Sequence, residues 1–180
     1  MRRSFVRAAV RSGATLAFLA AGALLAGPAQ IRFTYVDSAS MEPAFRPGDR
    51  LVNLRILGLS RGDVVSFASP VDGQLMVKRL VGLPGDRVGV VGGCLRLNGD
   101  SVREPYLREP RINYDLTPRS VAAGEYFLLG DNRNNSEDSS VWGPVPGELL
   151  RGKVVFIYWP PARAGRLVPP AVLRPAPRYP

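Results

Sequence analysis

Residues 74–86 read QLMVKRLVGLPGD, an apolar run that predicts a strand ending in a Pro-Gly-Asp turn. The run contains Lys78, one of two lysines in a chain whose other basic side chains are all arginines. A Lys in apolar surroundings can lose its proton near neutral pH, whereas Arg cannot. Lys78 is therefore a candidate general base. The alternative is a Lys on the wet side of a strand, with its stem packed on apolar neighbours.

The composition limits the kinds of chemistry that the chain can perform. Its 180 residues are 46% hydrophobic, enough for one domain with a core. The charge of +9 comes from scattered arginines without a nucleic-acid motif, so we expect no nucleic-acid partner. Cys94 stands alone and there is no His, which excludes a Ser/His/Asp triad and the usual zinc sites. We expect neither metal nor cofactor, and the base of any hydrolase here must be Lys, Asp or Glu.

The N-terminal residues have the pattern of a membrane segment. Residues 1–11 carry four arginines and no acid, and residues 12–30 carry no charge. We expect residues 12–30 to form one transmembrane helix that contacts membrane lipid, with residues 1–11 in the cytoplasm and the chain after residue 30 on the opposite side. The alternative is a cleavable signal peptide with small residues near its cleavage site, at 26–29.

The remainder predicts a mainly β domain over residues 31–160. Runs of β-branched and aromatic residues predict strands at 31–36, 49–55, 63–68, 74–81, 87–91, 94–97, 125–129 and 153–159. Gly-Asp pairs recur beside these runs and suit turns that begin a strand. Residues 104–119 are polar and predict an excursion over the surface. Residues 161–180, rich in Pro and Arg, predict a disordered tail.

Three separated stretches offer the parts of a serine hydrolase: residues 38–43 (SASMEP), the pair Lys78-Arg79, and residues 130–140 (GDNRNNSEDSS). A serine nucleophile needs a base in reach, an orienter for that base and donors for the oxyanion. Taken singly, the first stretch could be a turn and the third a polar surface loop. The acids of the third stretch could also suggest a calcium loop, but their spacing does not fit an EF-hand.

Together these stretches resemble the bacterial type I signal peptidases, serine/lysine proteases that release exported proteins from their signal peptides. The similarity runs from the predicted anchor to about Trp159. Its motifs are Ser40-Met41-x-Pro43, Lys78-Arg79-x-x-Gly82-x-Pro84-Gly85-Asp86, and Gly130-Asp131-Asn132-Arg133-x-x-Ser136-x-Asp138-Ser139. The resemblance implies a compact domain of antiparallel, strongly coiled β-sheets with few short helices, on the extracytoplasmic face of the bacterial cytoplasmic membrane.

The resemblance also implies a role for each matching residue. Ser40 is expected to be the nucleophile, Lys78 the neutral base that takes its proton, and Ser136 the hydroxyl that orients the lysine. The Ser38 hydroxyl and the Ser40 backbone N–H are expected to form the oxyanion hole.

Acidic and basic residues are expected to support the site. Asp138 would act through nearby arginines, including Arg79, and Asp131 is also expected to support the site. The chain departs from the family at Ser140, where an Arg is usual, which leaves Arg79 or Arg133 to pair with Asp138. A smaller departure is Ala44, often Thr in the family.

The substrate would be the signal peptide of an exported preprotein, cut after small residues in the pattern Ala-x-Ala. It could lie as an added strand between the segments that lead to Ser40 and to Lys78. Met41, Met76 and Val77 are expected to wall its shallow apolar pockets. Two alternatives stay open: a conjugation-type serine/lysine peptidase with a dedicated substrate, and a membrane-anchored β-domain that binds peptides without catalysis.

Overall fold

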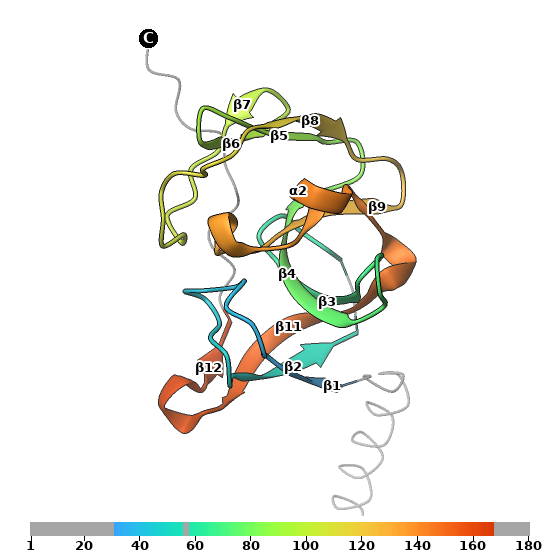
Figure 1. The fold of residues 1–180 in the computed structure, drawn as a ribbon. Coiled ribbons are helices and arrows are strands. Elements are labelled where there is room, and N and C mark those ends of the chain that lie inside the picture. Colours follow the sequence, from blue (N-terminus) through green and yellow to red (C-terminus); the bar gives the residue numbers. More distant parts are fainter. Residues whose placement is uncertain (1–30, 56–57, 168–180) are drawn as a thin grey trace, which may run out of the picture. The chain divides into compact units, whose positions relative to one another are not determined.

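The computed structural model of the chain describes residues 31–55 and 58–167 (Figure 1). The predicted cytoplasmic segment and anchor, residues 1–11 and 12–30, lie outside the described residues. Within residues 31–55 and 58–167, no helix has the length and apolar character needed to cross a membrane.

Antiparallel β-sheet is the main regular structure of the described chain, as the sequence predicts. The larger, eight-stranded sheet has the strand order β1 (Arg32–Tyr35), β2 (Arg50–Leu54), β11 (Leu150–Trp159), β3 (Val64–Ala68), β4 (Leu75–Gly82), β9 (Glu125–Leu129) and β10 (Val145–Pro146), and β12 (Gly165–Arg166) pairs with β11. Register shifts interrupt the pairing of β11 with both β2 and β3, and that of β4 with β9. Such shifts bend strands and let a sheet curve.

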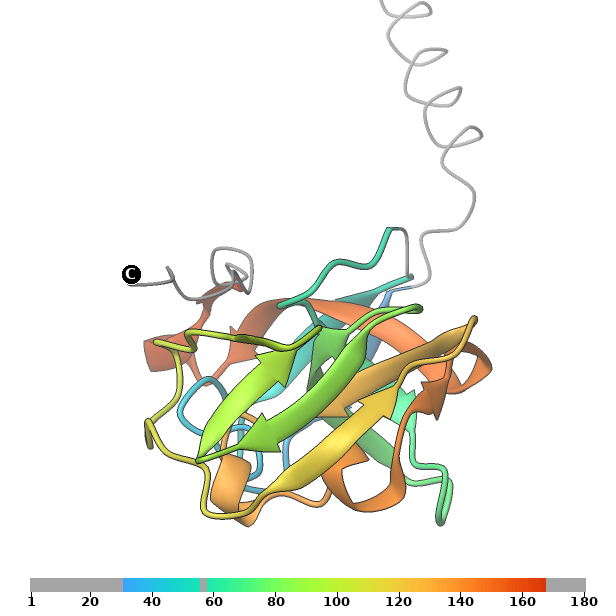
Figure 2. The ribbon, with the colours of Figure 1, turned by 90° about the horizontal axis from the view of Figure 1, so that it is seen from above.

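A second sheet is built by the middle of the chain. Its strand order is β7 (Asp100–Ser101), β6 (Cys94–Leu97), β5 (Arg87–Val91) and β8 (Leu116–Ser120), seen at the top of Figure 1 and from above in Figure 2. The helical segments of the described residues are short: η1 (Arg133–Asn135), α2 (Ser139–Trp142), η2 (Gly147–Leu149) and η3 (Pro161–Arg163).

A buried cluster joins the two sheets where β4 leads into β5. It includes Val81 and Phe127 from the first sheet and Val88 from the second. Gly82 lies at this crossing, and a Cβ atom there would come within 2.6 Å of Val88 Cγ2 and 2.9 Å of Phe127 Cβ. Only glycine therefore lets the strands approach this closely.

Three Gly-Asp pairs begin strands through the same turn. Gly48, Gly62 and Gly85 have φ of 97°, 93° and 90°, a conformation that suits glycine at the third position of a type II turn. The Asp that follows each glycine accepts, through its side chain, the backbone N–H three residues earlier: Arg46 to Asp49, Ser60 to Asp63 and Leu83 to Asp86. The prediction that Gly-Asp pairs begin strands is confirmed for β2, β3 and β5.

The eight predicted strands are all present, but two predictions about irregular segments are wrong in part. Residues 104–119 were predicted as a surface excursion; residues 104–115 form no strand or helix, whereas residues 116–119 belong to β8 of the second sheet. Residues 161–167, predicted as the start of a disordered tail, form η3 and β12, and Gly165 pairs with Ile157 of β11. Residues 168–180 lie outside the described part of the chain.

Candidate active site

Two segments that are far apart in the sequence bring Ser38 and Ser40 close to Lys78. β4 carries Lys78, and the segment after β1 carries the two serines. The Lys78 Nζ donates a hydrogen bond of 2.6 Å to Ser40 Oγ, and the Ser38 and Ser40 Oγ atoms lie 3.1 Å apart. A hydroxyl within hydrogen-bond reach of an amine is the arrangement that activates a serine.

Lys78 is buried, with 1% of its surface exposed, so it does not lie on the wet side of its strand. Burial lowers the pKa of Lys78 from its ordinary value to about 8. Nearby negative charges act in the opposite direction and raise this pKa, in decreasing order Asp138, Glu137, Asp131 and Asp37. A useful fraction of Lys78 is consequently neutral near pH 8, as a general base must be.

Ser40 belongs to residues 36–49, which we call the nucleophile loop. Its two ends are joined because Val36 N–H donates to Asp49 O at 2.9 Å and Gly48 N–H donates to Val36 O at 2.8 Å. Inside the loop, Phe45 N–H donates to Met41 O at 2.9 Å, and both side chains are buried. The loop is thus closed at its base and anchored in the core just after Ser40.

Asn132 holds the same loop from the other side of the site. Its backbone N–H donates to Ser40 O at 3.0 Å, and its side-chain Nδ2 donates to Ala39 O at 3.2 Å. Asn132 lies in the third motif, but the sequence does not reveal which backbone groups it contacts. It is a site residue that our sequence analysis did not identify.

Ser136 is close to the site but does not make the expected bond. Its hydroxyl is buried and has no hydrogen-bond partner, so the hydrogen bond to Lys78 that the resemblance implies is not formed in the structure. A Cβ atom at Gly130 would overlap both Ser136 Oγ and Ser40 O. Gly130 therefore permits this close approach of the third motif to the nucleophile.

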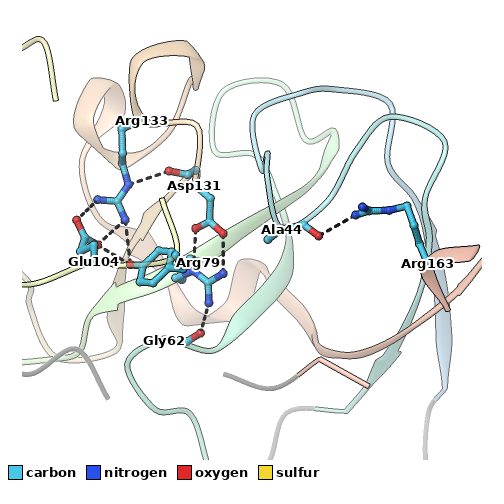
Figure 3. A network of polar contacts seen from close by, with 9 residues as sticks. Ala44, Gly62, Arg79, Glu104, Asp131, Arg133 and Arg163 are labelled. Atoms are coloured by element: carbon cyan, nitrogen blue, oxygen red, sulfur yellow. Dashed lines mark hydrogen bonds and ion pairs between the residues drawn. The ribbon is translucent and has the colours of Figure 1, made fainter. Parts of the chain in front are cut away.

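Arg79, the residue after Lys78 on β4, forms a buried ion pair with Asp131 (Figure 3). Arg79 Nε lies 2.7 Å from Asp131 Oδ1 and its second nitrogen 2.6 Å from Oδ2, the two-pronged geometry that suits a guanidinium and a carboxylate. Arg79 also donates to Gly62 O at 2.7 Å, and its guanidinium lies 4.4 Å from the centre of the Tyr106 ring.

Arg133 is paired with Glu104, which our sequence analysis did not place near the site. The Arg133 guanidinium donates to the two carboxylate oxygens at 2.5 and 2.7 Å, and to Gly130 O at 2.8 Å. Burial alone would lower the pKa of Arg133, but the charge of Glu104 holds it above its ordinary value. This pair connects residues 104–107 to the third motif.

Asp138 has a different set of partners from those we expected. Because Arg79 and Arg133 bind other acids, the prediction that one of them pairs with Asp138 is wrong. Asp138 is buried and accepts from Gly130 N–H at 2.9 Å, Ser140 N–H at 3.0 Å and Ser140 Oγ at 2.8 Å. Ser140 thus supplies neutral donors where the family usually has a cation.

A cleft of about 360 Å³ opens beside the Ser40 hydroxyl. It is lined by Met41, Met76 and Val77, the three residues expected to wall the substrate pockets, and by Tyr35, Val36, Asp37, Ser38, Ser40, Gln74, Leu75 and Lys78. Met41 is only 2% exposed and also belongs to the core. β9 pairs with β4 only from Arg79 onward, so among the described strands none pairs with that edge of residues 75–78.

Within residues 31–55 and 58–167, no three His, Cys, Asp or Glu side chains gather to hold a metal ion.

The known proteins that this chain resembles include signal peptidases. Residues 9–159 match the family described as "Signal peptidase, peptidase S26". The chain belongs to this signal peptidase family. The signal peptidase I of Leptolyngbya laminosa is 38% identical over 148 residues, which cover 76% of this chain and 72% of that protein. The signal peptidase I of Bacillus licheniformis is 36% identical over 139 residues, 69% of this chain and 75% of that protein.

Membership of the signal peptidase family makes the chain a serine endopeptidase. A crystal structure of a signal peptidase I from Enterococcus faecalis V583 is 34% identical and aligns with 54% of this chain and 97% of that chain, at a TM-score of 0.49.

Proposed function

We propose that this serine endopeptidase removes the signal peptides of exported preproteins, with Ser40 as nucleophile and Lys78 as general base. The observation that carries the proposal is the 2.6 Å hydrogen bond between Lys78 Nζ and Ser40 Oγ at the wall of a cleft. Family membership gives the reaction class, and the cleft gives the substrate a place to lie.

The chemical steps follow from this pair. Neutral Lys78 takes the Ser40 proton as Oγ attacks the carbonyl carbon before the cleaved bond, and the Ser40 N–H and Ser38 hydroxyl stabilise the oxyanion. The tetrahedral intermediate collapses, the C–N bond breaks, and the Lys78 ammonium gives its proton to the leaving amine. Water then attacks the ester carbonyl with Lys78 again as base, which releases the acid and restores the Ser40 hydroxyl.

We propose that the peptide binds as a strand along the unpaired edge of residues 75–78. Side chains that alternate along it would face Met41 and Val77 of the cleft wall. Small residues such as Ala at the first and third positions before the cut are what the resemblance to the type I signal peptidases implies. Met76 would contribute to the same wall.

The full chain in detergent tests this reaction. It should cut a preprotein after an Ala-x-Ala site, and Ser40→Ala and Lys78→Ala should each abolish cutting. Lys153→Ala is the matched control, because Lys153 is the chain's other lysine and pairs with Asp63 at 2.8 Å outside the cleft. A Lys78→Arg protein with full activity would contradict the assignment of the base, because Arg stays charged.

We further propose that residues 12–30 anchor the enzyme in the cytoplasmic membrane with the β-domain outside. Cys94 is exposed and is the chain's single cysteine, which makes it a site-specific probe. A maleimide that cannot cross membranes should label Cys94 in spheroplasts. Labelling that requires detergent lysis would place the β-domain on the cytoplasmic side and contradict this topology.

A further inference from the structure

The segment after β11 turns back onto the nucleophile loop. η3 ends at Arg163, β12 pairs with β11, and Leu167 N–H donates to Val155 O at 3.0 Å. The Leu167 side chain packs against the core cluster that contains Met41 and Phe45. This return segment lies beyond residues 9–159, which match the signal peptidase family.

Arg163 makes the polar contacts between this segment and the loop. Its Nε lies 2.9 Å from Asp49 Oδ1 and its second nitrogen 2.9 Å from Oδ2, while the same nitrogen donates to Ala44 O at 3.1 Å (Figure 3 shows the Ala44 contact). The Asp49 side chain is 2% exposed and that of Arg163 is 26% exposed. One guanidinium therefore ties the end of the nucleophile loop to the turn that follows Ser40.

These contacts place Arg163 among the restraints that determine where Ser40 lies. Asn132 holds the loop at Ala39 and Ser40, and Arg163 holds it at Ala44 and Asp49. Neither Ala44 nor Asp49 lines the cleft, so Arg163 supports the half of the loop that faces away from a bound peptide.

We propose that Arg163 is a positioning residue of the reaction, which keeps the Ser40 hydroxyl in line with Lys78 from outside the catalytic motifs. The inference deepens the proposed function and rests on it. A displacement of about 1 Å at a reacting group can lower a rate by about a hundredfold, so a loosened loop should slow the chemical step. Binding should change little, because the cleft wall on β4 is untouched.

The alternative is that Arg163 merely neutralises Asp49 and stabilises the fold. Arg61 provides a matched control for that effect. It forms the same two-pronged pair with Asp86, at 2.8 and 2.6 Å, in an equivalent Gly-Asp turn, and it is 29% exposed. Neither Arg61 nor Asp86 lines the cleft.

The test compares Arg163→Met and Arg61→Met in the full chain in detergent, with a peptide that has Ala at the first and third positions before the cut. Arg163→Met should lower kcat by about tenfold or more and leave KM within about twofold. Arg61→Met should lose a similar amount of thermal stability and keep its kcat. Added methylguanidinium should restore part of the kcat of Arg163→Met and leave that of Arg61→Met unchanged.

An unchanged kcat in Arg163→Met, or an equal loss of kcat in Arg61→Met, would overturn the proposal. If Arg163→Met does not fold, Arg163→Lys decides: it keeps a cation for Asp49 but loses the two-pronged geometry in which Nε and the second nitrogen bind both carboxylate oxygens. Its kcat should fall severalfold at an unchanged KM, and full activity would overturn the proposal. A wild-type chain that cuts no Ala-x-Ala peptide would instead contradict the proposed function.

Discussion

At the scale of single residues, Lys78 has to lose its proton to act, and its surroundings influence that step in opposite directions. Burial favours the neutral amine, whereas the nearby carboxylates favour the ammonium. Asp138 raises the pKa of Lys78 more than the other carboxylates do, and within the described part of the chain its side chain accepts from neutral donors on Gly130 and Ser140. Ser140, where the family usually has Arg, therefore influences the base through Asp138.

The rate of cleavage should rise with pH as Lys78 is deprotonated. With a pKa of about 8, roughly a tenth of Lys78 is neutral at pH 7, and kcat/KM should increase through a midpoint near pH 8. Ser140→Arg would give Asp138 a cationic partner and weaken its attraction for the Lys78 ammonium. The midpoint should then move to lower pH, and cleavage at pH 7 should become faster.

A pH series of kcat/KM with wild type, Ser140→Arg and Ser140→Gln measures this effect. Gln is long and polar but uncharged, so it controls for size and should not move the midpoint to lower pH. A midpoint that stays the same or rises in Ser140→Arg would show that Asp138 does not control the protonation of Lys78.

The site residues differ in how far the sequence could predict them. Lys78 was predicted as the base because its apolar run occurs together with the motifs around Ser40 and Ser136, whereas the run alone also fits a Lys on the wet side of a strand. Asn132 was not, because its contacts to Ala39 and Ser40 depend on which loops the fold brings together. The partners of Asp138 were predicted wrongly, because the sequence does not show that Glu104 comes across to bind Arg133.

At the scale of elements, the strands with alternating or continuous apolar runs were predictable and β8 was not. Its sequence, LTPRS, contains Pro118, which normally argues against a strand. β8 is the edge strand of its sheet, and a register shift in its pairing with β5 lies between the Val88 and Val90 partners. An edge position tolerates proline because the missing N–H can face away from the ladder.

The return segment was mispredicted for a related reason. Pro160, Pro161 and the nearby arginines give residues 161–167 the composition of a disordered tail. Composition does not reveal that Arg163 pairs with a buried carboxylate, that of Asp49, which lies 114 positions earlier in the chain. Long-range pairing of this kind overrides the local tendency toward disorder.

At the scale of the whole β-domain, residues 104–107 connect the second sheet to the active site. They follow β7, and Glu104 reaches across to Arg133, which is next to the Asp131 that binds Arg79. Tyr106 completes the connection: its hydroxyl donates to Glu104 at 2.5 Å, and its ring lies beneath the Arg79 guanidinium. The position of the third motif thus depends on the connection between β7 and β8 of the other sheet.

Breaking the pair of Glu104 and Arg133 should destabilise the whole domain, and removing both charges should cost much less. Glu104→Leu leaves a buried guanidinium without its counter-charge, and Arg133→Met leaves a buried carboxylate, so each should lower the free energy of unfolding by about 3–5 kcal/mol. The double variant buries no unpaired charge and should lose clearly less than the sum of the single variants. Denaturant unfolding of the full chain in detergent measures the free energy of unfolding of wild type, the two single variants and the double variant.

Arg108→Met is the control, because Arg108 is 74% exposed and lies 3.6 Å from Glu42, and this change should cost under about 1 kcal/mol. Additive losses in the double variant would show that the two side chains stabilise the domain separately and do not join the second sheet to the active site.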